Sequence, residues 1–503
     1  MLFVSTRGQV GKVSSAHAIK EGLAGDGGLF VPQSFPSLSL EQILSLNTLS
    51  YEQCAATILN YFLTDYSPAE LAECATAAYS PLKFGKNPAP LCKVGDRTDV
   101  LELWHGPTLA FKDIALQILP HLMTKAQNKT GTDTKIVILA ATSGDTGKAA
   151  LEGFADVPGT EIIVFYPEDG VSPVQKLQMV TQQGGNTKVF GIHGNFDDAQ
   201  RGVKEIFGDT GLAAELKDFG WEFSSANSIN WGRLVPQITY YFKSYADAVA
   251  NGRIEPGEKV IFAVPTGNFG DILAGYYAKK MGLPVKRFIC ASNSNNVLTD
   301  FINTGVYNKL RELNKTVSPS MDILVSSNLE RLLFDLTDNN SAQVAEWMTQ
   351  LNTAGQYKVT SDVAERVRDL FFAAWVDEME TKETIGRVYN DFEYVVDPHT
   401  AVAWRAAQKY RLLSSDDSYI IVLSTASPYK FCQTVLEGLG KAEGLDESQP
   451  FEAARRLTEE TGLPIPHQIT EMEHKPVLHN EVIGAGEMAA NIKKTLEIPV
   501  ENS

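Results

Sequence analysis

The sequence predicts an α/β protein built on parallel β-sheets that helices cover on both faces. From about residue 98 onward, short apolar runs alternate with amphipathic segments, which is typical of strand–helix repeats. The runs are nearly continuous in Val, Ile and Leu, as expected of strands that are buried on both faces. The predicted strands lie at residues 99–104, 135–141, 161–167, 187–194, 258–265, 285–292 and 419–426, with helices between them such as 111–127 and 173–185.

Three segments depart from this pattern. Residues 1–95 carry apolar residues at helical spacing, for example over 41–63, and predict a mainly helical N-terminal domain. Residues 300–395 are rich in Asn, Asp and helix formers and predict a helical insertion. Residues 441–503 are polar and are expected to form a C-terminal tail. The remaining chain divides into a large α/β domain, 96–134 and 226–440, and a small α/β domain, 135–225.

The composition excludes several classes of protein. The chain has 44 Lys and Arg against 61 Asp and Glu, so its formal net charge is −17 and nucleic acid or anionic lipid would repel it. No apolar stretch approaches the roughly 18 residues that span a membrane. The N-terminal segment lacks the apolar region of a signal peptide. We therefore expect a cytoplasmic protein that binds neither nucleic acid nor membranes.

The cysteines and histidines predict no metal site. The five cysteines are far apart, and no CxxC pair, Cys/His cluster or carboxylate cluster stands at ligand spacing. His105 is expected to form hydrogen bonds within a turn. His399 is expected at the start of a helix that Asp397 caps.

The first motif that suggests chemistry is HGPTLAFKD, residues 105–113, directly after the strand at 99–104. Lys112 falls in the first turn of the following helix, where the positive end of the helix dipole disfavours a cation. Burial would lower its pKa further, and a neutral lysine amine can attack a carbonyl. A solvated surface lysine is the usual alternative, which the apolar neighbours of Lys112 weaken.

Two glycine-rich turns follow predicted strands and open helices. TSGDTGKAA (142–150) and PTGNFGDILAG (265–275) both place free backbone amides where they can hold an anion. The first turn is not a P-loop, because Thr142 stands where the first glycine is required and Ala149 replaces the Ser or Thr. A plain helix cap by Ser143 is the alternative that needs no ligand.

A fourth motif, LSTASPYKF (423–431), puts the Ser424 and Thr425 hydroxyls at a strand end. A helix cap is again the ordinary alternative. Taken together, however, the four motifs supply a reactive lysine, two anion cradles and a hydroxyl at strand ends. Pyridoxal phosphate requires that set: a lysine for its aldehyde, a phosphate cradle and a partner for its ring nitrogen.

At these residues the sequence resembles the threonine synthases, which are fold-type II pyridoxal-phosphate enzymes. The resemblance covers nearly the whole chain and is closest to the longer, fungal-like branch. It implies a tryptophan synthase β-like fold, with two parallel-sheet lobes and the site between them. The motifs that carry it are STRG (5–8), DGGLFVP (26–32), HGPTLAFKD, TSGDTG, GNFGD (267–271) and STASPYKF (424–431).

The resemblance also implies a cofactor site. Lys112 would be the Schiff-base lysine, and Thr425 would form a hydrogen bond with the pyridine nitrogen. The residues around the cofactor phosphate, acting mainly through backbone amides, would be Gly267, Asn268, Phe269, Gly270 and Asp271.

The substrate site is implied in the same way. Ser143, Asp145 and Thr146 would lie in the loop that binds the substrate carboxylate or phosphate, although many fold-type II relatives have Asn where this chain has Asp145. The segment SSANSINWGRL (224–234) resembles the part of the family that meets the substrate phosphate. Its candidates are Asn227, Ser228 and Arg233, with Arg233 as the charge partner.

The implied activity is conversion of O-phospho-L-homoserine and water to L-threonine and phosphate, by a carbon–oxygen lyase reaction that ends threonine biosynthesis. The protein would be a monomer or a weak homodimer. Three alternatives remain: a phospho-lyase or serine/threonine dehydratase on the same fold, a non-catalytic regulatory protein that binds the cofactor, and a nucleotide-binding module. The phosphate-reading segment at 224–234 counts against a dehydratase, and the broken P-loop counts against the nucleotide module.

Overall fold

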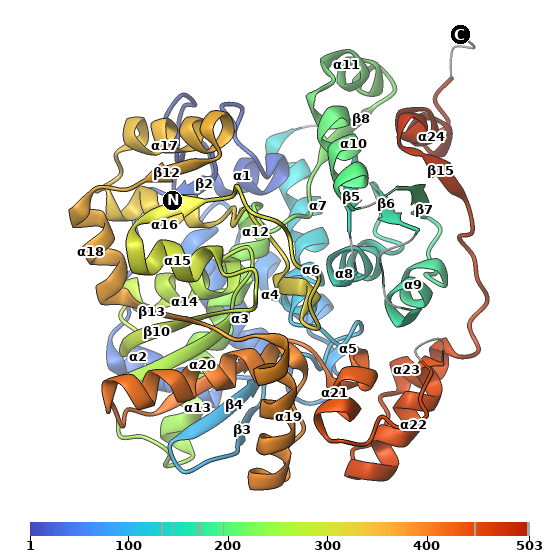
Figure 1. Cartoon of the computed structure of the whole chain (residues 1–503). Coiled ribbons are helices and arrows are strands. Elements are labelled where there is room, and N and C mark those ends of the chain that lie inside the picture. The colour runs from blue at the N-terminus through green and yellow to red at the C-terminus, as the bar shows by residue number, and fades with distance from the viewer. Residues whose placement is uncertain are drawn as a thin grey trace.

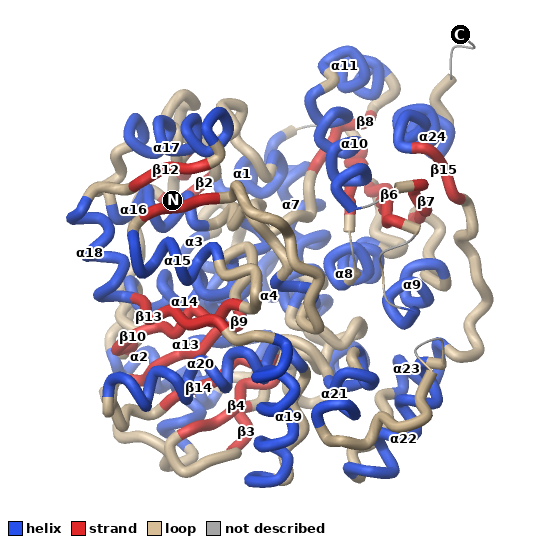
Figure 2. The backbone as a smooth tube through the Cα atoms, viewed as in Figure 1, coloured by secondary structure: helices blue, strands red, loops and turns tan. Residues whose placement is uncertain are grey.

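The chain forms two large open β-sheets and two short two-stranded pairs, with helices packed around them (Figure 1). The computed structural model describes residues 1–131, 134–142, 144–168, 171, 173–194, 196–446 and 449–499; of residues 196 and 197 only the backbone is described. Figure 2 shows the strands of one large sheet at the lower left and those of the other at the right, with a few short strands apart from both at the upper left. Within the described residues, no helix is both long enough and apolar enough to cross a bilayer.

The larger sheet has six strands in the order β13-β10-β9-β14-β4-β3. All neighbouring strands are parallel except β3, which pairs antiparallel with β4. The four strands of this sheet that the sequence predicts are present, shortened by a few residues at some ends. The bounds are β3 Leu91–Lys93, β4 Thr98–Glu102, β9 Val260–Pro265, β10 Val285–Ser292, β13 Phe371–Trp375 and β14 Ile420–Ser424.

The smaller sheet has five strands, all parallel, in the order β15-β7-β6-β5-β8. Its three predicted strands are also present. The bounds are β5 Lys135–Ala141, β6 Thr160–Pro167, β7 Thr187–His193, β8 Trp221–Ser224 and β15 Val482–Gly484. The parallel, two-sheet architecture agrees with the predicted fold class.

Helices from every part of the chain cover both sheets. The N-terminal segment contains α1 Ser15–Glu21, α2 Leu40–Ser45, η1 Leu46–Thr48, α3 Tyr51–Phe62, α4 Pro68–Ala78 and α5 Pro81–Phe84, with a short antiparallel pair, β1 Phe3–Ser5 and β2 Phe30–Pro32. The middle of the chain contains α6 Lys112–Leu116, α7 Leu119–Thr130, α8 Asp145–Phe154, α9 Pro173–Val180, α10 Phe196–Gly208, α11 Thr210–Asp218, α12 Trp231–Leu234, η2 Val235–Gln237, α13 Ile238–Ala250 and α14 Gly270–Lys280.

The predicted helix at 111–127 is two helices, α6 and α7. Pro120 stands in the first turn of α7, where its missing N–H costs nothing, so a new helix begins there rather than continuing α6. The helices of the N-terminal segment share one hydrophobic core with α13, α14 and inner faces of both sheets. This segment therefore belongs to the packed body of the protein.

The segment 300–395 is mostly helical but also contributes to the large sheet. Strand β13 pairs with β10, and its FFAAW sequence follows α18 directly, without a turn signal. The segment and its flanks contain α15 Val297–Thr304, β11 Val306–Asn308, η3 Pro319–Met321, α16 Leu329–Leu336, α17 Ser341–Ala354, β12 Gln356–Lys358, α18 Ser361–Leu370, α19 Glu378–Phe392, α20 Pro398–Ser414, η4 Pro428–Lys430 and α21 Cys432–Gly438.

The segment 441–503 is ordered over its described part and is more than a polar tail. Its elements are α22 Pro450–Thr461, α23 His467–Met472, β15, η5 Ala485–Glu487 and α24 Met488–Thr495. Figure 1 shows this segment running along the outside of the molecule, from α22 and α23 to the small sheet. There β15 extends the sheet beside β7 and α24 packs on α10. The segment therefore joins the two sheet systems.

Candidate functional site

Lys112 is the first residue of α6, in the turn that follows β4, as the sequence predicts. Its side chain is 11% exposed. The ε-amine donates to Ser320 Oγ at 3.3 Å and lies 3.7 Å from Asp145 Oδ2. Burial lowers the pKa of Lys112 to about 8; Asp145 opposes the shift, and the cations Lys430 and Arg233 add to it. A substantial fraction of this amine is therefore neutral near physiological pH.

Asp145 begins α8, after β5, and is the common partner of two lysines. Its Oδ1 lies 2.6 Å from Nζ of Lys430, whose side chain is fully buried. Its Oδ2 accepts a hydrogen bond of 3.0 Å from Ser320. Although burial would raise the pKa of Asp145, the charges of Lys430 and Lys112 hold it well below its ordinary value. Asp145 is therefore a buried carboxylate whose two oxygens both have partners.

The loop after β9, residues 266–270, leads directly into α14. Phe269 is the residue before the helix and has a left-handed backbone, with φ of 63°, which is uncommon for a bulky residue. A Cβ on Gly267 would lie 3.0 Å from the backbone oxygen of Ser320, so this position is packed tightly against the η3 turn. The Gly267 and Asn268 carbonyl oxygens accept hydrogen bonds from Ser326 and Asn328. Side chains of neighbouring residues thus fix the loop through hydrogen bonds to its carbonyl oxygens.

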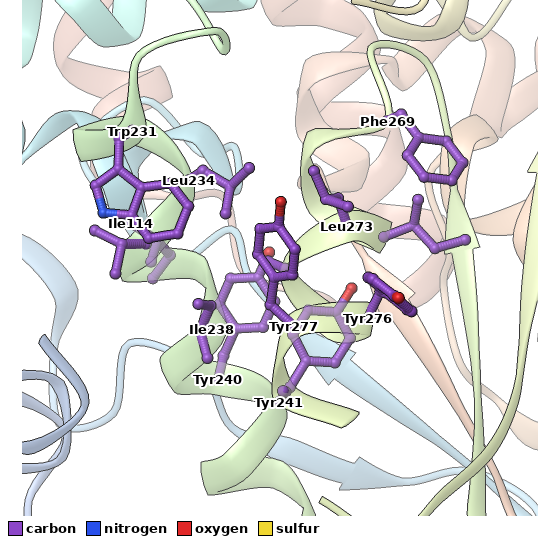
Figure 3. Packing of buried hydrophobic residues seen from close by; sticks show 14 of the residues in the cluster. Ile114, Trp231, Leu234, Ile238, Tyr240, Tyr241, Phe269, Leu273, Tyr276 and Tyr277 are labelled. Atoms are coloured by element: carbon purple, nitrogen blue, oxygen red, sulfur yellow. The ribbon is translucent and has the colours of Figure 1, made fainter. Parts of the chain in front are cut away.

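The side chain of Asp271 points into the core rather than toward the loop. Its Oδ1 accepts from the hydroxyls of Tyr240 at 2.6 Å and Tyr241 at 2.8 Å, and burial raises its pKa to about 6. Figure 3 shows these tyrosines of α13 beneath Phe269 and Leu273 of α14. Asp271 anchors the helix, and only its backbone N–H remains available to an anion.

Thr425 follows β14 and lies beside the Lys112 turn. Its carbonyl oxygen accepts the N–H of Phe111 at 2.8 Å, and Ala426 forms a bridge with Ala110. The residue is 6% exposed, and its hydroxyl has no hydrogen-bond partner within the described part of the chain. The hydroxyl is therefore free to accept or donate a hydrogen bond to a ligand atom.

Arg233 lies in α12, after β8, and the residue is 3% exposed. One nitrogen donates to Ala226 O at 2.6 Å, while the buried Nε has no partner, and no ion pair involves Arg233 in the part of the chain described. Burial lowers its pKa to about 10. An uncompensated, desolvated guanidinium near Lys112 is suited to binding an anionic group.

The other predicted substrate residues lie in several elements around the site. Asn227 lies in the turn before α12, where its carbonyl oxygen accepts the N–H of Asn230. Ser228 approaches the glycine loop, since its Cβ lies 3.9 Å from where a Gly270 Cβ would stand. Thr146 is half-buried in the first turn of α8. Ser143 lies outside the described residues.

The sequence left open that Ser143 simply caps the helix that became α8. Its N-cap is Gly144, and the amides of Gly144 and Gly147 both donate to the Thr142 hydroxyl, each at 3.0 Å. Thr142, which stands where a P-loop would have its first glycine, therefore fixes this turn.

Sequence reasoning missed two residues at the centre of the site. Lys430 is quoted within STASPYKF, but a lysine alone gave no signal that it pairs with Asp145. Ser320 belongs to the segment expected as a helical insertion, where a Ser in a polar stretch is unremarkable. His399, predicted at a helix start capped by Asp397, is found there, and its Nε2 also accepts the N–H of Ser320 at 3.2 Å.

These residues fit pyridoxal phosphate. Lys112 supplies a partly neutral amine, the turn before α14 supplies backbone amides at a close approach, and Thr425 supplies a hydroxyl without a partner. Within the described residues, no three His, Cys, Asp or Glu side chains are grouped as a metal site would require.

Family models match most of the chain. The model described as "Threonine synthase N terminus" matches residues 2–79, "Pyridoxal-phosphate dependent enzyme" matches residues 100–426, and "Threonine synthase, C-terminal" matches residues 400–482. The second match contains Lys112, Asp145, Arg233 and Thr425. The third contains η4, α22 and α23, so the C-terminal segment is also part of the family's pattern.

Individual relatives agree with these matches. Threonine synthase of Pseudomonas aeruginosa is 41% identical over 462 residues, which are 91% of this chain and 95% of that protein. Human threonine synthase-like 1 is 40% identical over 434 residues; the match takes in 84% of this chain but only 58% of the longer human protein.

Solved structures give the same result. The crystal structure of threonine synthase from yeast superposes with a TM-score of 0.87 at 33% identity, covering 99% of both chains. The structure described as PLP-bound threonine synthase from Brucella melitensis superposes with a TM-score of 0.86 at 35% identity, covering 99% of this chain and 98% of that one. The fold, the site and these similarities agree, and the chain belongs to the threonine synthase family of pyridoxal-phosphate-dependent enzymes.

Proposed function

We propose that this protein converts O-phospho-L-homoserine and water to L-threonine and inorganic phosphate. The observation that carries this proposal is the pairing of a buried, partly neutral lysine amine with an uncompensated buried arginine whose charge acts on it. The amine suits proton transfer at an amino acid, and the arginine suits a phosphate that the substrate brings. A dehydratase substrate has no phosphate for Arg233 to bind.

Pyridoxal phosphate would be held by Lys112 through its ε-amine, by the backbone amides of residues 267–271 and by the hydroxyl of Thr425. When bound, the cofactor supplies an electron sink that makes the protons next to the substrate amine acidic. A neutral hydroxyl at Thr425, rather than a carboxylate, moderates that sink, which favours elimination over transamination.

The substrate phosphate would be bound by Arg233, with Asn227 and Ser228 as polar partners. Asp145 cannot bind an anionic group through its side chain, because the carboxylate is charged and both oxygens are already occupied. We assign its backbone N–H, with those of Ser143 and Thr146, to the substrate carboxylate. The Asp145 carboxylate instead pairs with Lys430 and accepts the hydroxyl of Ser320, which lies beside Lys112.

Lys112 Nζ would move protons between the α-, β- and γ-carbons of the substrate. The bond from the γ-carbon to the phosphate oxygen breaks, a water oxygen adds to the β-carbon, and the γ-carbon becomes the methyl group of threonine. General base catalysis of this kind is most effective when the base has a pKa near the working pH, as Lys112 does. Closure of the two lobes would keep water out until the phosphate has left.

The test is to incubate the purified yellow protein with O-phospho-L-homoserine and to assay phosphate and threonine in the same tube. Equal amounts of both are expected. Phosphate with a keto acid would instead mean a phospho-lyase that adds no water, and no phosphate at all would overturn the proposed substrate. Borohydride reduction followed by peptide mapping tests the cofactor lysine separately, since the added mass should fall on Lys112 and be lost in Lys112→Ala.

We also propose that the protein acts in the cytoplasm, without nucleic acid or membrane partners, as a monomer or weak homodimer. The formal charge of −17 and the five unpaired cysteines support a reducing, aqueous compartment. Sedimentation at micromolar concentration would test the oligomeric state.

A further inference from the structure

Ser320 brings the segment 300–395 into the candidate site. It lies in η3, a single turn that packs against Gly267. Its Oγ donates to Asp145 Oδ2 at 3.0 Å and accepts from Lys112 Nζ at 3.3 Å. The hydroxyl therefore stands between the amine and the carboxylate, which are 3.7 Å apart.

The turn that carries Ser320 is fixed by a network of partly buried hydrogen bonds around Asp322, which includes the buried side chains of Asn293 and Asn295. Asp322 accepts from Asn293 at 2.7 Å, from Asn295 at 2.9 Å and from both the N–H and the hydroxyl of Thr316. Such a network holds a loop in one conformation, because breaking it would leave buried polar groups without partners.

The backbone of Ser320 is fixed separately by His399. His399 Nδ1 faces Asp397 Oδ2 at 2.6 Å, and its Nε2 accepts the N–H of Ser320 at 3.2 Å. The Nδ1 contact with a carboxylate assigns the proton to Nδ1 and leaves Nε2 as an acceptor. His399 is 1% exposed and its ring packs on Phe431, so this arrangement has little freedom.

We propose that Ser320 is a further catalytic residue of this enzyme, whose hydroxyl holds the free amine of Lys112 off Asp145, and that His399 and Asp397 are its positioning residues. This inference deepens the proposed function and rests on it. Because the amine donates one N–H to Ser320, its lone pair can point away from the carboxylate, toward the carbon whose proton it takes. Direct pairing with Asp145 would instead favour the ammonium form, which cannot act as a base.

The charged groups around the Lys112 amine determine how loss of the Ser320 hydroxyl would change the protonation of that amine. Asp145 from α8 is the only carboxylate that faces Lys112 among the groups described as acting on it, and Lys430 from η4 and Arg233 from α12 are cations. His399 from α20 acts on Asp145. With the Ser320 hydroxyl removed, the amine can close onto Asp145, and the proton on Lys112 is held more tightly.

The test measures the protonation of Lys112 directly in the full-length chain freed of cofactor. The protein is labelled briefly with acetic anhydride at a series of pH values, and the Lys112 peptide is quantified by mass spectrometry, with the exposed Lys93 as an internal reference. Ser320→Ala should move the labelling midpoint of Lys112 upward by about one pH unit, the lower end of the effect of a close opposite charge. Ser320→Thr, which keeps the hydroxyl, should restore the midpoint. A midpoint in Ser320→Ala that is unchanged or lower overturns the proposal.

The holoenzyme supplies the second readout. Ser320→Ala should lower kcat about tenfold, within the range of one lost catalytic contact, and move the acid limb of the kcat profile upward, while KM and the amount of bound cofactor stay near their normal values. His399→Phe, which removes the acceptor for Ser320 N–H, should shift the Lys112 midpoint in the same direction, and His399→Gln should shift it less. A loss of bound cofactor in Ser320→Ala with no change in the midpoint would mean a structural role only.

The two proposals fail in different ways. If the protein releases no phosphate from O-phospho-L-homoserine, the proposed function fails, but the labelling midpoint still reports whether Ser320 controls the amine. If the midpoint does not move while phosphate and threonine appear in equal amounts, the inference about Ser320 fails alone.

Discussion

Lys430 Nζ lies 2.6 Å from Asp145 Oδ1, and the lysine side chain is fully buried. The same ammonium donates to the carbonyl oxygen of Thr108 at 3.0 Å. The pair thereby connects the turn after β14, the start of α8 and the Lys112 turn, which come from three distant parts of the sequence. Both charges are removed from water, so each depends on the other.

Lys430→Met is expected to lower the free energy of unfolding by about 3–5 kcal/mol, because it leaves the carboxylate of Asp145 buried with less compensation. In the Asp145→Asn background the same change should cost about 2 kcal/mol less, since the charge is already gone. Urea unfolding of the four proteins measures this coupling.

The exposed pair Lys125–Glu73, with a similar separation of 2.7 Å, is the matched control. Its coupling should stay below about 1 kcal/mol because water screens it. If the two changes at Lys430 and Asp145 are additive, the pair is not a unit and the three turns are held together by other contacts.

A second prediction concerns Lys112 and pH. Burial lowers its pKa from 10.5 to about 8, so the unfolded chain binds this proton more tightly than the folded one. The full cost of burying the ammonium is therefore present below pH 8 and declines as the pH rises toward about 10.5. Lys112→Met should raise the free energy of unfolding of the cofactor-free chain by about 3 kcal/mol at pH 7, and by about half of that at pH 9.5.

Denaturant unfolding at the two pH values checks this difference. Lys93→Met, at an exposed position in β3, should change the free energy of unfolding little and equally at both. A destabilisation of the Lys112→Met protein at pH 7 would mean that the ammonium form is favoured by its surroundings, against the direction given by burial.

A third prediction concerns the glycine loop. Gly267 has the backbone oxygen of Ser320 at 3.0 Å and Met321 Cα at 3.4 Å from where a Cβ would stand. Gly267→Val must push the loop and the η3 turn apart, which should weaken cofactor binding about 5- to 150-fold, since overpacking costs about 1–3 kcal/mol. Gly25→Val, at a position with no neighbouring atom within 4 Å, should leave the affinity unchanged. Equilibrium dialysis of the cofactor against each variant distinguishes the two.

The sequence predicted much of this architecture because buried parallel strands have a strong local signature. Runs such as KIVILAA became strands with the same bounds. Strand β13 was missed because FFAAW follows a helix without a turn, and β15 because three residues carry no periodic pattern. Short strands of this kind are determined by the sheet edge that they join, which lies elsewhere in the chain.

The candidate site divides along the same line. Lys112, the Gly267 loop and Thr425 lie in motifs at the ends of predicted strands, where ligands of parallel sheets bind. Their position singled out the motifs, and the family resemblance supplied the role of each residue. Lys430 and Ser320 could not be found in that way, because their significance is a contact with Asp145 that only the fold creates. Asp271 illustrates the opposite case, since its place in the motif is predicted while its side chain turns to Tyr240 and Tyr241.

The last prediction tests the phosphate cation. Arg233→Gln should raise KM for O-phospho-L-homoserine about 10- to 100-fold, the effect of losing charge-assisted hydrogen bonds worth about 1.5–3 kcal/mol, while the bound cofactor changes little. Arg233→Lys keeps the charge, so its KM should fall between that of the unsubstituted protein and that of Arg233→Gln. Steady-state kinetics and the visible absorbance of the protein measure the two effects separately. If Arg233→Gln strips the cofactor instead, the residue holds the cofactor phosphate.

Arg331 is the control for the loss of a buried arginine whose guanidinium nitrogens all have partners within the protein. It is also fully buried, and burial likewise lowers its pKa to about 10. Each of its three nitrogens, however, has a partner within the protein: they donate to the carbonyls of Phe30 and Ile229 and to Asn328. Arg331→Gln should therefore lower the melting temperature and leave KM for the phosphorylated substrate unchanged. Equal effects of the two substitutions on KM would show that the rise in KM of Arg233→Gln reflects a disturbed core. The two side chains differ chiefly in whether every guanidinium nitrogen has a partner within the protein.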